Sequence, residues 1–204
     1  MMEYKLGPCW IRMSFWFVAS VAFAVLFDTD GFALYGLLAA VLHECGHIAA
    51  MCCWKTPPKS IHCGMCCIDI EDPARGMRGY RRDIGVLLAG PLVNMIAGAI
   101  LFLPSWWCQS PRFMTAALTQ GVTGLFNLLP VPTLDGGQIL YSWLCLHGQA
   151  QRAARIATVC GVLVLLPVAV AGFLLLLRSK YNYSLLLLAC YLMAAMLLKE
   201  DAYY

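Results

Sequence analysis

The chain has 204 residues, of which 61% are hydrophobic and only 12% charged, with a formal net charge of +3 and a mean hydropathy of +0.73. This charged fraction is about half of the roughly 25% that is usual in soluble domains. The composition therefore excludes a disordered chain, and it excludes a small soluble domain, which could not bury so much apolar surface in one core.

Stretches without Asp, Glu, Lys or Arg mark the candidate membrane spans, because a helix needs about 20 apolar residues to cross the hydrocarbon core. We expect an all-α polytopic membrane protein with about six transmembrane helices, forming one domain over residues 1–204 without a PDZ or CBS module. The first span is expected at residues 10–27 and the last two within 156–198. The uncharged stretches are Met13–Phe27, Gly31–Trp54 (interrupted by Glu44), Ile84–Trp107, Phe113–Gln151 (interrupted by Asp135), Ile156–Leu177 and Tyr181–Leu198.

Basic residues set the expected orientation, since cytoplasmic loops carry an excess of Lys and Arg. With both termini in the cytoplasm, all of the 14 basic residues except Arg112, Arg178 and Lys180 lie on the inner side. The basic loop from Lys55 to Arg82 is then a contact with anionic lipid, and the net charge requires no nucleic acid partner. Most of the 11 cysteines fall in spans or face the reducing cytosol, so no disulfides are expected.

The sizeable polar insert, Lys55–Asp83, follows the second span and contains a β-compatible run, Ile61–Ile70, with Gly64 near its middle. This pattern predicts a short β-hairpin. The run also holds a C-x-x-C pair, Cys63 and Cys66, with Cys67 next to it. Residues this close in a strand point to opposite faces, so we do not expect a second zinc site here, and a role for these cysteines stays open.

The fourth span is predicted to be broken, because Pro130 and Pro132 interrupt it just before Asp135-Gly136-Gly137. Non-helical backbone at membrane depth is tolerated only where it is buried in protein or lines a watery cavity. A broken span that also carries an acidic residue is therefore a candidate functional site.

Two acidic residues, Glu44 and Asp135, lie inside the uncharged stretches, where an ionisable group suggests function. Glu44 belongs to an H-E-x-x-H motif on a helical span. The i, i+4 spacing puts His43 and His47 on one helix face, where both can bind one Zn²⁺, while Glu44 can take a proton from water. The competing interpretation is a set of polar side chains that satisfy one another within a helix bundle.

A catalytic zinc usually has three protein ligands and one open position. Asp135 is the candidate third ligand, because it is the remaining carboxylate inside an uncharged stretch. His62, in the polar insert, and His147, at the end of a span, are the alternatives.

Three motifs in this order resemble the site-2 protease family of intramembrane zinc metalloproteases, in the style of the compact bacterial branch that includes stage IV sporulation protein FB. They are His43-Glu-Cys-Gly-His47, Ala89-Gly-Pro-Leu-Val-Asn94 and Asn127-Leu-Leu-Pro-Val-Pro-Thr-Leu-Asp135-Gly-Gly137. The resemblance covers about Leu42–Gly137. Cys45 departs from the family, which commonly has an aliphatic residue there.

The resemblance implies a catalytic core at about residues 31–147 in which His43, His47 and Asp135 bind one Zn²⁺ and Glu44 is the base and proton shuttle. Asn127 would hold the substrate carbonyl and its developing oxyanion, although it could instead be a helix-breaking or hydrogen-bonding residue. Structural support is expected from Gly90, Asn94, Pro130 and Gly136.

The predicted function is hydrolysis of peptide bonds within or near the transmembrane segment of a membrane-tethered protein, releasing a regulatory factor in the bacterial cytoplasmic membrane. An edge strand carrying Ile61, Ile68 and Ile70 could hold the extended substrate by β-augmentation. The partners expected are this substrate, the lipid bilayer and a regulatory membrane protein or oligomer. The alternatives are a non-proteolytic metal-binding or metal-transport protein that uses the same ligands, and a degenerate family member that acts as a scaffold.

Overall fold

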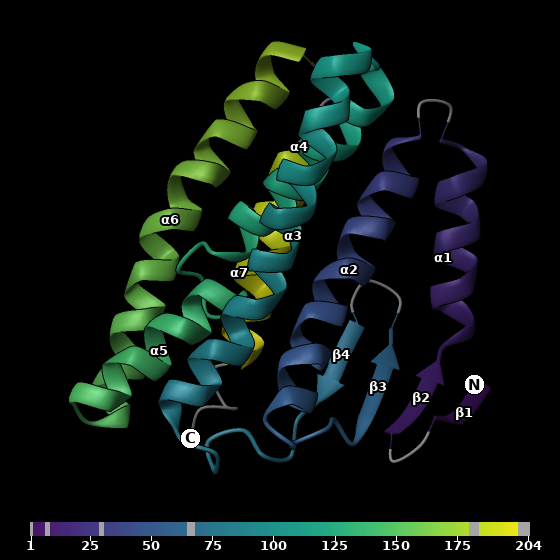
Figure 1. Cartoon of the computed structure of the whole chain (residues 1–204). Helices are drawn as coiled ribbons and strands as arrows, with labels where there is room; N and C mark the ends of the chain where they lie inside the picture. The colour runs from purple at the N-terminus through teal and green to yellow at the C-terminus, as the bar shows by residue number, and fades with distance from the viewer. Residues whose placement is uncertain (1, 7–8, 29–30, 65–67, 180–183, 200–204) are drawn as a thin grey trace. The chain divides into compact units, whose positions relative to one another are not determined.

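The computed structural model describes residues 2–6, 9–28, 31–64, 68–179 and 184–199. The chain divides into two compact units, Met1–Phe126 and Asn127–Tyr204, which we treat separately. The first unit contains β1 (Met2–Leu6), β2 (Cys9–Met13), α1 (Phe15–Leu26), α2 (Phe32–Cys53), β3 (Ser60–Cys63), β4 (Ile68–Glu71), α3 (Tyr80–Cys108) and α4 (Pro111–Asn127), whose last residue is the boundary (Figure 1). The second contains α5 (Asp135–His147), α6 (Ala150–Ser179) and α7 (Ser184–Lys199).

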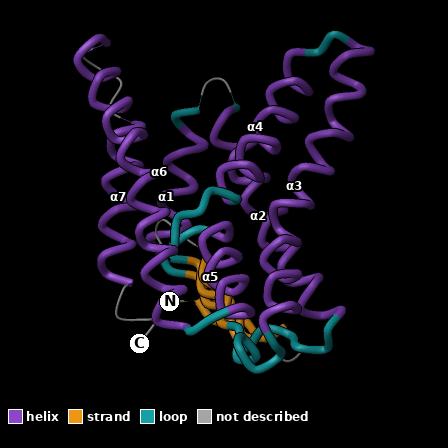
Figure 2. Tube along the Cα trace, turned by 90° about the vertical axis from the view of Figure 1, so that its left-hand side faces the viewer, coloured by secondary structure: helices purple, strands orange, loops and turns teal. Residues whose placement is uncertain are grey.

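The four strands form one small mixed sheet in the order β1-β2-β3-β4, drawn in orange in Figure 2. The predicted hairpin is present: β3 and β4 pair antiparallel, with Ile61 opposite Ile70. β2 pairs parallel to β3, which is possible because α1 and α2 form the crossover between them. The expectation of an all-α protein is therefore wrong at the N-terminus, where β1 and β2 extend the hairpin into a sheet.

The described part of the chain holds three helices that are long and apolar enough to cross a membrane, namely α2, α3 and α6, so the count of six spans is not confirmed. The predicted first span is wrong in its first turn, because residues 10–13 belong to β2. Ser14 then caps α1 by accepting a hydrogen bond from the Trp16 amide, and α1 has only 12 residues. α1 and residues Leu185–Met196 of α7 are apolar but shorter than a span.

α2 and α3 pack closely because small residues let their backbones meet. A Cβ atom at Gly46 would lie only 2.7 Å from the carbonyl oxygen of Ala89 and 3.0 Å from the Cα atom of Gly90. The start of α2 is fixed by Asp28, whose carboxylate accepts hydrogen bonds from the amides of Phe32 and Ala33. The two motifs that the sequence separates by about 40 residues therefore meet in the first unit.

A buried ion cluster fixes the loop between β4 and α3. The Arg78 guanidinium lies 2.7 Å from the Asp83 carboxylate, contacts Asp72, and donates to the Thr56 hydroxyl at 2.9 Å. The side chains of Arg78, Asp72 and Asp83 are each less than a tenth exposed. The cluster therefore joins the loop to the residues that follow α2 and to the first turn of α3.

In the second unit, the segment from Leu128 to Leu134 folds back over the start of α5. A Cβ atom at Gly136 would overlap the carbonyl group of Leu128, and one at Gly137 would overlap that of Val131. On its other side, this segment packs Pro132 against Gly161 of α6. α4 ends at Asn127 and α5 begins at Asp135, whereas a single Pro-broken membrane span stays a prediction, as does the single domain.

Candidate metal centre

Two histidines of α2 form the core of the candidate site. His43 and His47 are both buried, and their Nε2 atoms lie 3.1 Å apart. Their spacing of one helical turn puts both rings on the same face of α2, as the sequence predicted. Two ring nitrogens therefore converge on one point inside the first unit.

A backbone carbonyl of α3 fixes the orientation of His47. Its Nδ1 atom lies 2.8 Å from the Val86 carbonyl oxygen, and since a carbonyl can only accept, Nδ1 must carry the proton. The Nε2 atom of neutral His47 then bears the lone pair that a metal ion needs. A backbone contact of this kind leaves no side-chain signal in the sequence.

Gly90 of α3 lies directly against the two rings. A Cβ atom there would be 2.5 Å from Nε2 of His47 and 2.9 Å from Nε2 of His43. These distances are too short for any real Cβ contact, so only glycine allows α3 to approach the metal-binding atoms this closely.

Glu44 lies between the two histidines in sequence and is partly buried on α2. Burial raises the pKa of the Cys63 thiol, and the negative charge of Glu44 raises that pKa further. The end of β3 therefore lies within electrostatic reach of Glu44. Sequence reasoning missed this electrostatic effect, because the spacing of Cys63 pointed to its neighbouring cysteines rather than to α2.

Asp135 is the first residue of α5, where the positive end of the helix dipole favours a carboxylate. Asp135 lies in the second unit, and His43 and His47 lie in the first. Neither His62 of β3 nor His147, exposed at the end of α5, belongs to a metal-ligating group among the described residues. Cys66 and Cys67 lie outside the described residues.

The remaining predicted site residues are placed as follows. Asn127 ends α4, Pro130 lies in the segment before α5, and Asn94 is fully buried on α3. Ile68 and Ile70 lie on β4, an outer strand of the sheet. The prediction that Ile61 belongs to an edge strand is wrong, because β3 is paired on one side with β2 and on the other with β4.

The histidine pair suits zinc in both chemistry and spacing. Zinc binds neutral imidazole nitrogen at about 2.0–2.1 Å in tetrahedral sites, which puts two such ligands roughly 3.3 Å apart. The 3.1 Å between the two Nε2 atoms is close to this value. Two imidazoles and one carboxylate also form a common set of ligands for a catalytic zinc.

Comparison with known proteins points to one family of peptidases. The model of peptidase family M50 matches residues 108–168, which include the motif around Asp135 but not the H-E-x-x-H motif. A search of curated proteins found no match. The fold matches that of the site-2 protease from Methanocaldococcus jannaschii, with a TM-score of 0.65 and 21% identity over 98% of this chain and 94% of that chain. The matching family model and the shared fold support the site-2 protease family, as the three motifs predicted.

Proposed function

We propose that this protein is an intramembrane zinc metalloprotease that hydrolyses peptide bonds within or near the transmembrane segment of a membrane-tethered protein. The observation that carries the proposal is the buried pair His43 and His47, whose Nε2 atoms lie 3.1 Å apart with Glu44 on the same helix. The peptidase family model and the shared fold support a metalloprotease more broadly.

In this proposal His43, His47 and Asp135 hold one Zn²⁺, and Gly90 leaves room for the two imidazoles. The bound ion would polarise the scissile carbonyl and make a water molecule more acidic. Glu44 takes the proton from the attacking water and passes it to the leaving amine.

Two further groups would hold and orient the substrate. The Asn127 amide donates a hydrogen bond to the oxygen of the scissile carbonyl as negative charge develops on it. An extended substrate segment pairs with the outer edge of β4, beside Ile68 and Ile70. Pro130 and Gly136 keep the segment before Asp135 in its folded-back conformation, which the close contact of Gly136 with the Leu128 carbonyl supports.

The membrane setting completes the proposal. The apolar helices α2, α3 and α6 support an integral membrane protein, and the basic loops favour cytoplasmic termini in a bacterial cytoplasmic membrane. Cleavage would release a regulatory factor from its membrane anchor, and a regulatory membrane protein or an oligomer could control access to the site.

The test is metal analysis combined with cleavage of candidate membrane-tethered substrates. Glu44→Gln should keep one zinc per chain and abolish cleavage, because the amide cannot accept the proton. Cys45→Ala, at an exposed neighbouring position, is the matched control and should behave like the natural protein. If Glu44→Gln cleaves normally, the protease mechanism is wrong, and zinc bound without any cleavage by the unsubstituted protein favours a metal carrier.

A further inference from the structure

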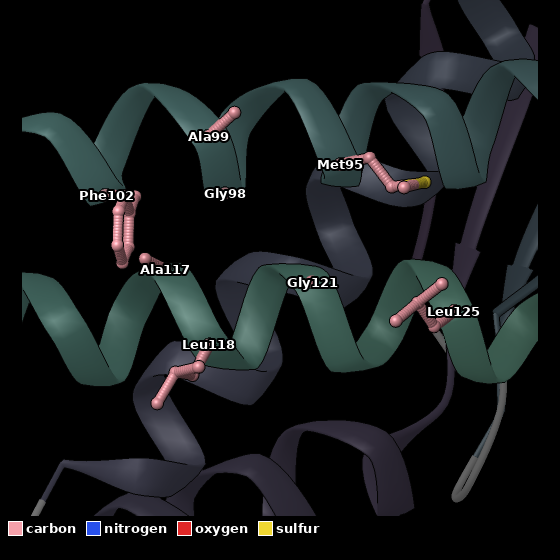
Figure 3. A pocket seen from close by; sticks show the side chains of 8 residues that line it. All are labelled: Met95, Gly98, Ala99, Phe102, Ala117, Leu118, Gly121 and Leu125. Carbon is pink, nitrogen blue, oxygen red and sulfur yellow. The ribbon is translucent and has the colours of Figure 1, made fainter.

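A second pair of polar side chains lies buried where α3 packs against α4. The two helices run side by side, as Figure 3 shows for the stretch that includes Gly98 and Gly121. A Cβ atom at Gly124 of α4 would lie 3.3 Å from the Cβ atom of Asn94, and one at Gly98 of α3 would lie 3.4 Å from that of Gln120. Each glycine therefore lies opposite a polar residue of the other helix.

Asn94 and Gln120 are almost completely shielded from the surface, at 0% and 7% exposure. Among the residues that the structure describes, neither amide atom of Asn94 has a hydrogen-bond partner, and the Oε1 atom of Gln120 has none. A buried polar atom without a partner is unfavourable, most of all in a membrane domain, where solvent is far away. Three such atoms in one helix contact indicate a ligand that supplies their hydrogen bonds.

The spacing of the two amides fits a very small ligand. Asn94 and Gly98 are one turn apart on α3, as Gln120 and Gly124 are on α4, so the two side chains start about one helical pitch, or about 5.4 Å, from each other. Two side chains that start this close can both reach one small molecule with hydrogen bonds of about 2.7–3.2 Å each. Since neither residue is open to the surface, a water molecule fits this position better than a peptide.

We propose that Asn94 and Gln120 bind an internal water molecule between α3 and α4 and that this water keeps the neighbouring metal site hydrated. The three available amide atoms match the roughly three hydrogen bonds that a buried water makes. A donor and an acceptor are both present on Asn94, as water requires.

The link to hydrolysis follows from the position of Asn94 on α3, and it rests on the proposed function. Gly90, which contacts the Nε2 atoms of both histidines, precedes Asn94 by four residues and therefore lies on the same face of α3. A water held by Asn94 is thus about one helical turn from the metal-binding atoms. It can replace the water that each round of hydrolysis consumes.

An apolar groove of about 240 Å³ runs along the same pair of helices (Figure 3). It is lined by Met95, Gly98 and Phe102 of α3 and by Ala117, Gly121 and Leu125 of α4. The residues that line the groove have no polar side chains, so the groove supplies no hydrogen bonds to such a water.

Thermal unfolding in detergent tests the shared ligand without depending on activity. Asn94→Ala and Gln120→Met should each lower Tm by about 2–4 °C, since each removes partners of the same water. The double variant should unfold no earlier than the less stable single variant, because the ligand is already lost. Thr119→Val is the matched control, because the Thr119 hydroxyl donates a hydrogen bond to the Thr115 carbonyl of its own helix. The effect of Thr119→Val should add to that of Gln120→Met.

If the losses of Tm for the two variants add up in the double variant, or if Gln120→Met has a higher Tm, the proposal is overturned. Removal of an amide that has no partner stabilises a protein, whereas removal of an amide that binds a water molecule destabilises it. The second measurement is cleavage. Asn94→Ala should lower kcat about tenfold, the upper range of one hydrogen bond, with zinc content and KM unchanged, and Asn94→Ser should restore part of the rate. A higher KM with unchanged kcat would instead indicate contact with the substrate and would refute the water site.

The two measurements separate the two proposals. If the natural protein cleaves nothing while the Tm effects are coupled, the proposed function fails and the water site stands. If it cleaves its substrate while the Tm effects simply add, the water site fails and the protease assignment stands.

Discussion

α3 packs against α2 and against α4, and in both contacts a glycine lies opposite a polar side chain. Against α2, Gly90 lies beside the imidazoles of His43 and His47, and the Val86 carbonyl binds His47. Against α4, glycines again lie opposite polar side chains, but the amide atoms of Asn94 find no partner among the described residues. Burial is similar in both contacts, so the difference lies in the partners. A glycine opposite a polar group brings helices together, and the unfilled hydrogen bonds show where a ligand belongs.

The strongest way to break the first contact is Gly90→Ala. The new methyl group would lie 2.5 Å from Nε2 of His47, so both rings must turn away from their common point. We expect loss of bound zinc and a fall in cleavage of at least about 100-fold, as displaced catalytic groups produce. Zinc content and cleavage rate measure the effect. Gly36→Ala on α2, where a Cβ atom meets nothing within 4 Å, is the control; full zinc occupancy in Gly90→Ala would contradict the close approach.

Arg78→Met extends the comparison to a third set of buried polar side chains, in which the charged groups bind one another. Arg78 binds Asp72, Asp83 and Thr56, and its removal leaves two buried carboxylates without their cation. We expect the free energy of unfolding to fall by about 3–5 kcal/mol. Chemical denaturation measures it, with Arg75→Met, at an exposed position in the same loop, as the control. A loss no larger than that of the control would show that the cluster contributes little.

The fold was predictable where the signal is local. Uncharged stretches correctly predicted α2, α3 and α6, and the Ile61–Ile70 run correctly predicted the β3–β4 hairpin. β2 was missed because Trp10–Met13 directly adjoins an apolar helix and was counted with it. Its strand form depends on pairing with Ser60–Cys63, about 50 residues later in the chain. The cap residue Ser14 was the signal that could have separated the two.

In the candidate site too, the features that depend on local sequence could be predicted, and those that depend on packing could not. The i, i+4 spacing of His43 and His47 follows from helix geometry, so their convergence could be predicted. The bond from His47 to the Val86 carbonyl could not, because every residue has a carbonyl group. The effect of the Glu44 charge on the pKa of Cys63, and the lack of hydrogen-bond partners for the Asn94 amide among the described residues, likewise depend on packing between elements that are distant in sequence.

Two glycines of α4 test the second contact with a matched pair of substitutions. At Gly124 a Cβ atom would lie 3.0 Å from the Pro91 carbonyl oxygen, whereas at Gly121 it meets nothing within 4 Å. Gly124→Ala should therefore destabilise the protein by about 1–3 kcal/mol through overpacking. Gly121→Ala should be neutral or stabilise it by up to about 1 kcal/mol, because alanine favours helix. Equal unfolding free energies for the two variants would show that α3 and α4 do not pack as closely as this contact requires.

The smallest effect is expected at Glu71, an exposed polar partner on β4 that contrasts with both buried contacts. Its carboxylate accepts hydrogen bonds from the Ser60 hydroxyl at 2.6 Å and from the Lys59 ammonium at 3.0 Å. The Ser60 bond, followed by the Lys59 bond, lowers the pKa of Glu71 below its ordinary value of 4.5.

A carboxyl group whose pKa is lower in the folded state stabilises the fold above its ordinary pKa, and this contribution disappears as the pH falls through the lowered value. Protection of the β3–β4 amides against hydrogen exchange, corrected for the intrinsic pH dependence of exchange, should therefore fall slightly below about pH 4.5 in the natural protein. Ser60→Ala removes the larger cause and should shift this change toward higher pH, while Glu71→Gln should remove it. An identical pH profile in all three proteins would mean that the Ser60–Glu71 bond does not stabilise the hairpin.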